Sequence, residues 1–245
     1  MEATRSPRGM AFARQALQTA RCVLGNRPWS TLRVLDVGCG YGATTAALGG
    51  LCREAVGLEP SAALYAQACR AEHGRDNVRF VHADFNAWHT FEQFDLIILD
   101  NVYEHIADHD RTLAAIAERL AAGGAFYIVA PNKLWPIEVH YGLPFLSYLP
   151  LPIANAYLRI TRRGTSYADA AYAPSVWSLR AEFRREPRLR PRFVLPADLT
   201  LTQAGATPLY RCGASLLRRF PALWAVSKAL VIVGSHHDAP QSALG

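Results

Sequence analysis

The chain has 245 residues, of which 51% are hydrophobic and 19% are charged, and its formal net charge is +6. This length and composition allow one large α/β domain with a sizeable core and exclude global disorder. Only two of the 26 basic residues are lysines, and basic and aromatic residues do not alternate as a single-strand nucleic-acid groove requires. No nucleic-acid partner is therefore expected.

The N-terminal segment, residues 1–29, contains a stretch at residues 10–24 whose apolar side chains recur at helical spacing. It has no continuous apolar run like that of a signal peptide. The five cysteines are scattered and never paired as CxxC, which fits reduced thiols better than a disulfide framework or a zinc site. These features predict a cytoplasmic protein that begins with an amphipathic helix.

From residue 30 onward, short apolar runs alternate with helical stretches. Strands are predicted at residues 32–37, 54–59, 78–84, 94–100 and 125–131, and helices at residues 44–51, 61–73 and 110–124, the last ended by glycines. Continuous apolar strands separated by helices predict a parallel sheet covered on both faces. The expected architecture is a doubly wound, Rossmann-like α/β fold.

The alternation stops after Pro131 and resumes near residue 174. Later elements are predicted as a helix at 174–186, a strand at 192–199, a helix through 216–229 and a last strand at 231–235 that inserts antiparallel, which makes seven strands. The tail, residues 236–245, is expected to be disordered. The predicted domain spans residues 30–235.

A glycine-rich loop follows the first predicted strand. It reads Asp36-Val37-Gly38-Cys39-Gly40-Tyr41-Gly42 and leads into a helix. Glycines let the backbone turn tightly and approach a ligand closely. The loop also satisfies G-x-G-x-x-A, so a dinucleotide site is an alternative, and the loop alone is a weak signal.

Two acids that close the next strands add to the loop. Glu59 ends the second strand, where a carboxylate can accept both hydroxyls of a ribose. Asp84 ends the third and is followed by Phe85, a carboxylate for an exocyclic amine with an aromatic ring beside it. The loop and the two acids converge on an adenosine.

With these residues the chain resembles the class I S-adenosylmethionine-dependent methyltransferases. The matching motifs are "VLDVGCGYG", "VGLEPS", "HADF", "FDLIILDNVYEHI" and "RLAAGGAFYIVAPN", in order over roughly residues 30 to 132. The resemblance implies S-adenosyl-L-methionine as cofactor, and it implies that the cofactor contacts are Asp36, Gly38, Cys39, Gly40, Glu59, Pro60, Asp84, Phe85 and Asn101. A nicotinamide oxidoreductase is disfavoured, because D-x-G-x-G-x-G is the methyltransferase form of the loop and no second mononucleotide-binding half follows.

Several motifs of methyltransferase subclasses are absent. The fourth motif reads Asp100-Asn101-Val102-Tyr103 and not the DPPY type of amino-group methylation, and Pro131-Asn132 does not supply the Asp-Asn pair of a metal-dependent catechol site. These absences favour O-methylation of a small molecule or of a sugar- or lipid-linked acceptor, with no metal. A catalytically silent protein that binds the cofactor and serves a partner enzyme is the remaining alternative.

Two histidines are candidate catalytic groups. His105 follows the fourth strand, where the family's histidine shapes the loop near the cofactor, so a structural role is favoured for it. His140 is the better base, because Glu138 shares its face in an extended segment and a carboxylate that close can orient the imidazole. A hydrogen-bonded pair that only pins the loop is the alternative.

The segment after the fifth strand, residues 132–173, is predicted to be a substrate cap. Residues 141–158 carry no formal charge, which is near the minimum length of a membrane span, but three prolines would break such a helix. Its aromatic residues suit an apolar or amphipathic acceptor: Trp135, Tyr141, Phe145, Tyr148 and Tyr157. Arginines at its far end, Arg159, Arg162 and Arg163, can hold a phosphate or carboxylate, and the basic stretch at residues 180–192 leaves peripheral membrane contact open, with a solvated surface as the alternative for both.

Overall fold

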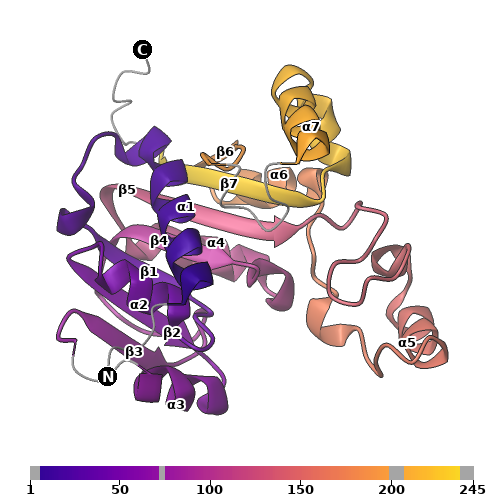
Figure 1. Cartoon of the computed structure of the whole chain (residues 1–245), viewed down its shortest axis with the longest axis horizontal. Helices are drawn as coiled ribbons and strands as arrows, with labels where there is room; N and C mark the ends of the chain where they lie inside the picture. Colours follow the sequence, from indigo (N-terminus) through magenta and orange to yellow (C-terminus); the bar gives the residue numbers. More distant parts are fainter. Residues whose placement is uncertain (1–5, 72–74, 199–206, 238–245) are drawn as a thin grey trace.

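The computed structural model describes residues 6–71, 75–198 and 207–237. They form a seven-stranded sheet in the order β3-β2-β1-β4-β5-β7-β6 (Figure 1). The strands are β1 Arg33–Val37, β2 Glu54–Glu59, β3 Val78–His82, β4 Phe94–Asp100, β5 Leu120–Pro131, β6 Leu189–Phe193 and β7 Ala229–His236. β1 to β5 pair in parallel, and β7 lies antiparallel between β5 and β6. The predicted mixed sheet with a late antiparallel strand is confirmed.

The two faces of the sheet bury two separate hydrophobic clusters. Neighbouring residues such as Val34 and Leu35 belong to different clusters, because successive side chains of a strand point to opposite faces. Helices α1 (Pro7–Leu24) and α2 (Ala43–Gly49) cover one face, and α4 (His109–Arg119) and α6 (Val176–Arg185) cover the other. Helix α3 (Ala62–Ala71) packs along β2 and β3. This double cover explains why the strands read as continuous apolar runs.

The helix predicted at residues 110–124 is too long. Helix α4 ends at Arg119, and Gly123 and Gly124 belong to β5. The pairing of β4 with β5 shifts register beside these glycines, and a Cβ at Gly124 would lie 3.1 Å from the carbonyl oxygens of Phe94 and Asp95. The glycines therefore mark a bulge with a close approach between strands, not a helix end.

Two C-terminal predictions also need correction. The strand predicted at 192–199 is β6, which ends at Phe193 and begins three residues earlier than expected. It is an edge strand in which arginines and Pro191 replace the apolar alternation, as is common at edges. The helix predicted through 216–229 divides at Pro221 into α7 (Pro208–Arg219) and the 3-10 helix η6 (Pro221–Val226), because proline interrupts helical hydrogen bonding. Of the predicted tail, residues 238–245 lie outside the described residues.

Residues 132–173, which we call the cap, protrude from the sheet between β5 and α6 (Figure 1). The cap contains the 3-10 helices η3 (Leu146–Tyr148) and η4 (Ala168–Ala170) and the helix α5 (Leu151–Ile160). It has a hydrophobic cluster of its own, built from Leu143, Leu146, Ala154, Leu158, Tyr167 and Ala170. Within the described ranges, no helix has the length and apolar character that crossing a bilayer requires.

The cap starts from a buried hydrogen-bonded junction around Asn132. Its side-chain Nδ2 lies 2.9–3.1 Å from the carbonyl oxygens of Trp224, Ala225 and Ser227, and its Oδ1 accepts from the amide of Leu134. One amide side chain therefore joins the end of β5 to the segment that leads into β7.

We expect Asn132→Ala to lower the free energy of unfolding by about 2–3 kcal/mol, because it leaves buried carbonyl groups without donors. Urea denaturation measures the change. Asn132→Asp should be at least as destabilising, because its carboxylate would face the same carbonyl oxygens. A loss below about 0.5 kcal/mol for Asn132→Ala, the range of ordinary surface substitutions, would contradict this role.

Candidate functional site

The carboxyl ends of β1, β2 and β4 meet at one edge of the sheet, where ligands bind in open α/β sheets. The loop after β1 continues the β1–β2 pairing, since the amides of Gly38 and Cys39 both donate to the carbonyl of Leu58, at 2.8 and 3.0 Å. Gly38 has a φ of +66°, and a Cβ there would lie 2.5 Å from the side chain of Val102. Only glycine fits this turn without strain.

Glu59, at the end of β2, holds this loop in place. Its side chain is buried, and its two oxygens accept from the amides of Gly40 and Ser61, each at 2.9 Å. Each carboxylate oxygen keeps a further lone pair for a ligand hydroxyl. Pro60 is exposed beside it, with its carbonyl 3.0 Å from Nε2 of His82.

The two residues predicted to contact an adenine, Asp84 and Phe85, differ in their exposure. Asp84 is exposed, and its Oδ1 accepts from the amides of Asn86 and Ala87. The Phe85 ring is only 3% exposed and packs in the core with the Arg119 guanidinium 5.2 Å above it. The contact of Phe85 with an adenine stays a prediction, and with the ring buried its backbone is the part that would make it.

Two aspartates with raised pKa values lie at the same edge. Burial raises the pKa of Asp36 to about 6, although the Thr45 hydroxyl donates to it at 2.6 Å. Burial, with the charges of Asp36 and Glu104, raises the pKa of Asp100 to about 7. Asn101 adopts a φ of +53° and donates from Nδ2 to Asp100 at 2.9 Å. Asp100 was not among the predicted site residues, although its place at the end of β4 was the available signal.

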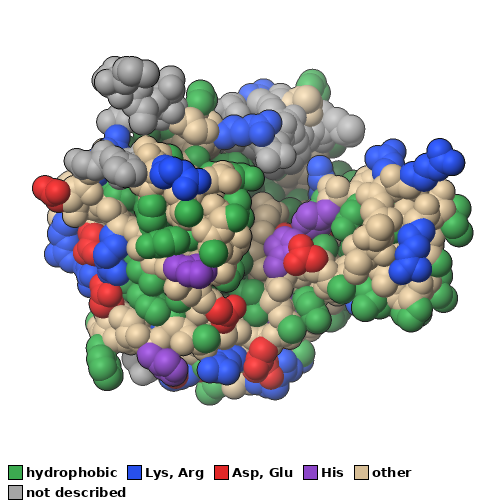
Figure 2. Space-filling view, turned by 90° about the horizontal axis from the view of Figure 1, so that it is seen from below, with side chains coloured by type: hydrophobic (Ala, Val, Ile, Leu, Met, Phe, Trp, Pro, Cys, Tyr) green, Lys and Arg blue, Asp and Glu red, His purple; other side chains and the backbone are tan. Residues whose placement is uncertain are grey.

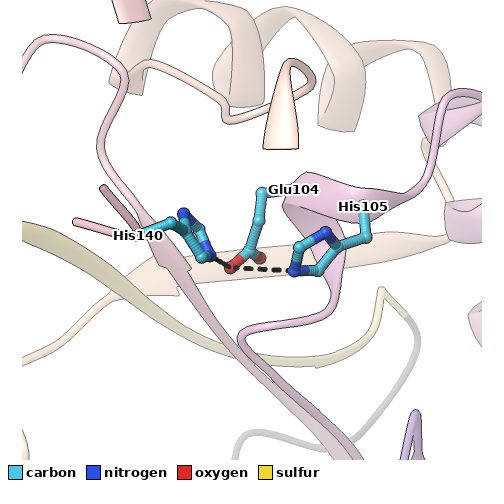
Figure 3. Close-up of side chains that lie close together, drawn as sticks. All are labelled: Glu104, His105 and His140. Atoms are coloured by element: carbon cyan, nitrogen blue, oxygen red, sulfur yellow. Dashed lines mark ion pairs between the residues drawn. The ribbon is translucent and has the colours of Figure 1, made fainter. Parts of the chain in front are cut away.

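Three side chains meet beyond β4. Glu104 and His105 lie on the 3-10 helix η2 (Tyr103–His105), and His140 comes from the cap. Figure 3 shows the Glu104 carboxylate between the two imidazole rings. Its Oε1 is 3.9 Å from Nε2 of His105 and 3.7 Å from Nε2 of His140. Sequence reasoning identified both histidines but not Glu104, because nothing in the sequence marks it as buried.

Glu138 and His140 are close together, but through a tight turn and not an extended segment. The amide of Gly142 donates to the Glu138 carbonyl, and the Glu138 carboxylate accepts from the amides of His140 and Tyr141. Nδ1 of His140 is 2.7 Å from the same carboxylate. This hydrogen bond raises the pKa of His140. Burial alone would raise the pKa of Glu138, but the hydrogen bonds from His140 and the amides lower it.

Figure 2 shows a hollow in the surface between the body of the molecule and the lobe formed by the cap, with histidine and acidic side chains gathered at it. A separate depression of about 300 Å³ opens at the base of the cap, with Lys133, His109 and Glu182 among the residues that line it. Tyr103 holds η2 in place, because its hydroxyl donates to Glu182 at 2.8 Å. Burial of this hydroxyl raises the pKa of Tyr103.

Part of the chain matches a known protein family. Residues 35–128 match the methyltransferase domain family. A ubiquinone biosynthesis O-methyltransferase of Bradyrhizobium sp. is 32% identical over 107 residues, which cover 43% of this chain and 42% of that protein. The corresponding protein of Brucella anthropi is 29% identical over 151 residues, which cover 60% and 57%. The chain thus matches about half the length of these curated relatives.

Solved structures confirm the fold. The YcgJ protein of Bacillus subtilis is similar with a TM-score of 0.57 and 18% identity, covering 91% of this chain and 96% of that one. The plantazolicin methyltransferase BpumL, in complex with a monoazolic desmethylPZN analog and SAH, is similar with a TM-score of 0.59 and 14% identity, covering 94% of this chain and 85% of that one. The matched domain contains Glu104 and His105 but ends before Glu138 and His140.

The raised pKa of Asp100 predicts a pH-dependent cost to stability. Its carboxyl binds a proton up to about pH 7 when folded but only to about pH 3.9 when unfolded. Between these values the folded state binds more protons, so its stability falls as pH rises, and above pH 7 the loss is complete. Asp36 and Glu104 are the charged neighbours that contribute.

Asp100→Asn removes this ionisation and keeps an acceptor for Asn101. We expect the variant to gain stability over the unchanged protein by roughly 1–3 kcal/mol more at pH 8 than at pH 5, the scale of one to two pKa units. Urea denaturation at the two pH values measures it. An equal difference at both pH values would show that Asp100 titrates normally.

Proposed function

We propose that this chain transfers the methyl group of S-adenosyl-L-methionine to a hydroxyl group of a small amphipathic acceptor, because residues 35–128 match the methyltransferase domain family and the chain has the class I S-adenosylmethionine-dependent fold. The observation that carries the proposal is that the glycine-rich loop and the cluster of Glu104, His105 and His140 both follow strands at the same edge of the sheet. The glycine loop, held by Glu59, packs through Gly38 against Val102, the residue before the helix η2 that carries Glu104 and His105. One part suits a nucleoside, and the other suits an acceptor that must lose a proton.

The cofactor is proposed to lie across the ends of β1, β2 and β4. Glu59 would accept from the ribose hydroxyls with the lone pairs that Gly40 and Ser61 leave free. The loop amides would face the amino-acid part of the cofactor, with Asp36 below the turn. This part of the cofactor carries a sulfonium and an ammonium charge, and both favour the ionised forms of Asp36 and Asp100.

The acceptor is proposed to enter between the cap and η2. Phe145 and Tyr148 are exposed on the cap and lie in edge-to-face contact, with ring centroids 5.7 Å apart. Such aromatic surfaces suit the apolar part of an amphipathic molecule. Two curated relatives are O-methyltransferases of ubiquinone biosynthesis, which supports a hydroxyl group as the acceptor and leaves its carrier, small molecule, sugar or lipid, to experiment.

His140 is proposed to assist deprotonation of this hydroxyl. Glu138 fixes the ring through Nδ1, so Nε2 faces the cluster and the acceptor. The pairing matches the arrangement of a base with the carboxylate that orients it. A cytoplasmic setting belongs to the same proposal, because all five cysteines are described and none forms a disulfide.

Two other functions give different experimental results. A cofactor-binding partner protein would bind S-adenosylmethionine without turnover, and a nicotinamide oxidoreductase would bind a dinucleotide more tightly. Mass spectrometry of the protein with cofactor and cell extracts separates methyl transfer from the partner role, and calorimetric titration with a nicotinamide dinucleotide tests the oxidoreductase. A product 14 Da heavier than its precursor supports methyl transfer, and its absence from all extracts, despite cofactor binding, supports the partner role.

We expect Glu59→Gln to weaken S-adenosylmethionine binding by roughly 1–3 kcal/mol, because a ribose hydroxyl loses a charged acceptor. Calorimetric titration measures the affinity. The glutamine oxygen can still accept from one loop amide, so the variant isolates the charge better than alanine does. Glu92→Gln, which removes a carboxylate from the arginine pairs at the opposite ends of the strands, is the matched control and should bind normally. Equal affinities for both variants would remove Glu59 from the cofactor site.

We expect His140→Ala to bind the cofactor normally and to lower turnover about 10²–10⁴-fold, the usual contribution of a group that assists proton transfer. Steady-state kinetics with the acceptor found by mass spectrometry measure it. If His140 only pins the turn, the variant loses thermal stability, and its remaining rate keeps the pH dependence of the unchanged protein. Full activity and full stability together would exclude both roles.

A further inference from the structure

Glu104 is an unusual side chain among the described residues. It is fully buried, and neither carboxylate oxygen has a hydrogen-bond partner among the described residues. Burying a carboxylate without a partner is costly, and proteins normally pair such a group or use it to bind a metal ion. The two imidazole nitrogens at 3.7 and 3.9 Å are too distant for hydrogen bonds. The arrangement is therefore incomplete without a further positive group.

The two histidines present lone pairs to this carboxylate. Nδ1 of His105 is 2.8 Å from the backbone carbonyl of Asp169, and a carbonyl can only accept, so Nδ1 carries the proton. Nδ1 of His140 is 2.7 Å from the Glu138 carboxylate, which favours the same tautomer. In a neutral ring with the proton on Nδ1, Nε2 is an unprotonated ligand atom. Both Nε2 atoms face Glu104 (Figure 3).

The three ligand atoms also have a suitable spacing. All lie within 4.8 Å of one another. Ligands about 2.0–2.2 Å from one ion lie roughly 3.4 Å apart in tetrahedral coordination. The side chains of His105 and His140 are 33% and 31% exposed, so small ring rotations can close the remaining gap.

We propose that Glu104, His105 and His140 form a binding site for one divalent transition-metal ion. Two imidazoles and one carboxylate suit zinc, manganese or iron rather than magnesium, which prefers oxygen ligands. The hydrogen bonds from Nδ1 to Asp169 and Glu138 are the outer contacts that orient metal-binding histidines. Three protein ligands leave a coordination position open, as in catalytic sites and not in closed structural ones.

The role of this site rests on the proposed function. The open position would take the acceptor oxygen, whose O–H proton leaves to solvent while the cation stabilises the oxyanion. The oxygen then forms its bond to the methyl carbon as the carbon–sulfur bond breaks, and the sulfonium becomes a neutral thioether. His140 would then assist deprotonation through the cation. A metal ion at this site would make methyl transfer metal-dependent, in contrast to the metal-independent enzyme expected from the sequence.

Calorimetric titration of Zn²⁺ into the full chain, freed of metal with a chelator, tests the site. We expect one ion per chain, with the affinity lowered more than about 100-fold in Glu104→Gln, His105→Ala and His140→Ala. Glu138→Gln alters only an outer contact and should weaken binding about 10–100-fold. His89→Ala, an exposed histidine outside the cluster, is the matched control and should bind Zn²⁺ as the unchanged chain does.

Titration with Co²⁺ separates this site from the exposed thiols of Cys22 and Cys212. Binding at the cluster should give visible d–d absorption without a thiolate charge-transfer band. Circular dichroism and S-adenosylhomocysteine binding show that each variant is folded. If Glu104→Gln does not fold, the two histidine variants carry the test.

The proposal is overturned if the unchanged chain binds no Zn²⁺, or if folded His105→Ala and His140→Ala variants bind it as tightly as His89→Ala does. Neither titration requires turnover. Zn²⁺ binding without S-adenosylmethionine binding would leave the metal site intact and contradict the proposed function. Methyl transfer that persists in the chelator-treated chain, with no Zn²⁺ bound, would support the proposed function and contradict the catalytic role of the metal ion.

Discussion

The site depends on one constraint, which is that the pairing with β2 continues past the end of β1 into the glycine-rich loop. One carbonyl, that of Leu58, accepts from two successive loop amides, and Glu59, the next residue, accepts from a third at Gly40. The turn they impose requires a left-handed backbone at Gly38, packed against Val102. Val102 in turn precedes η2, which carries Glu104. The loop proposed to face the cofactor is thus linked to the cluster proposed to face the acceptor by the packing of Gly38 against Val102 and by the short backbone segment from Val102 to Glu104.

A second property of this edge is its concentration of buried negative charge. Asp36, Glu59 and Glu104 are buried, and the pKa values of Asp36, Asp100 and Glu104 are raised mainly by burial. Buried negative charge lowers the stability of the ligand-free protein, and positive charge nearby reduces this loss. A sulfonium cofactor and a divalent cation are both positive, so one electrostatic arrangement favours both proposed ligands. Binding of the two proposed ligands would offset the loss of folding stability that these buried carboxylates cause.

The sequence predicted the sheet better than it predicted the site. Apolar runs and helical spacing are local signals, and they located β1 to β5 and the antiparallel β7 correctly. They failed where tertiary context decides: Gly124 lies at a bulge, and Pro191 and its arginines occupy an edge strand. Burial is not a local signal either. The sequence did not show that the Phe85 ring lies in the core, or that Glu104 is more buried than its neighbour His105.

The pairing of Glu138 with His140 was predicted from spacing, but the turn that produces it depends on the cap. The carboxylate accepts two backbone amides of that turn, so the imidazole is oriented only when the cap is folded. The cap also supplies the Asp169 carbonyl that orients His105. The matched domain provides Glu104 and His105, whereas the cap provides the third side chain and both orienting groups. An acceptor held by the cap would therefore be bound and activated by the same segment, and a different cap on this domain would change both together.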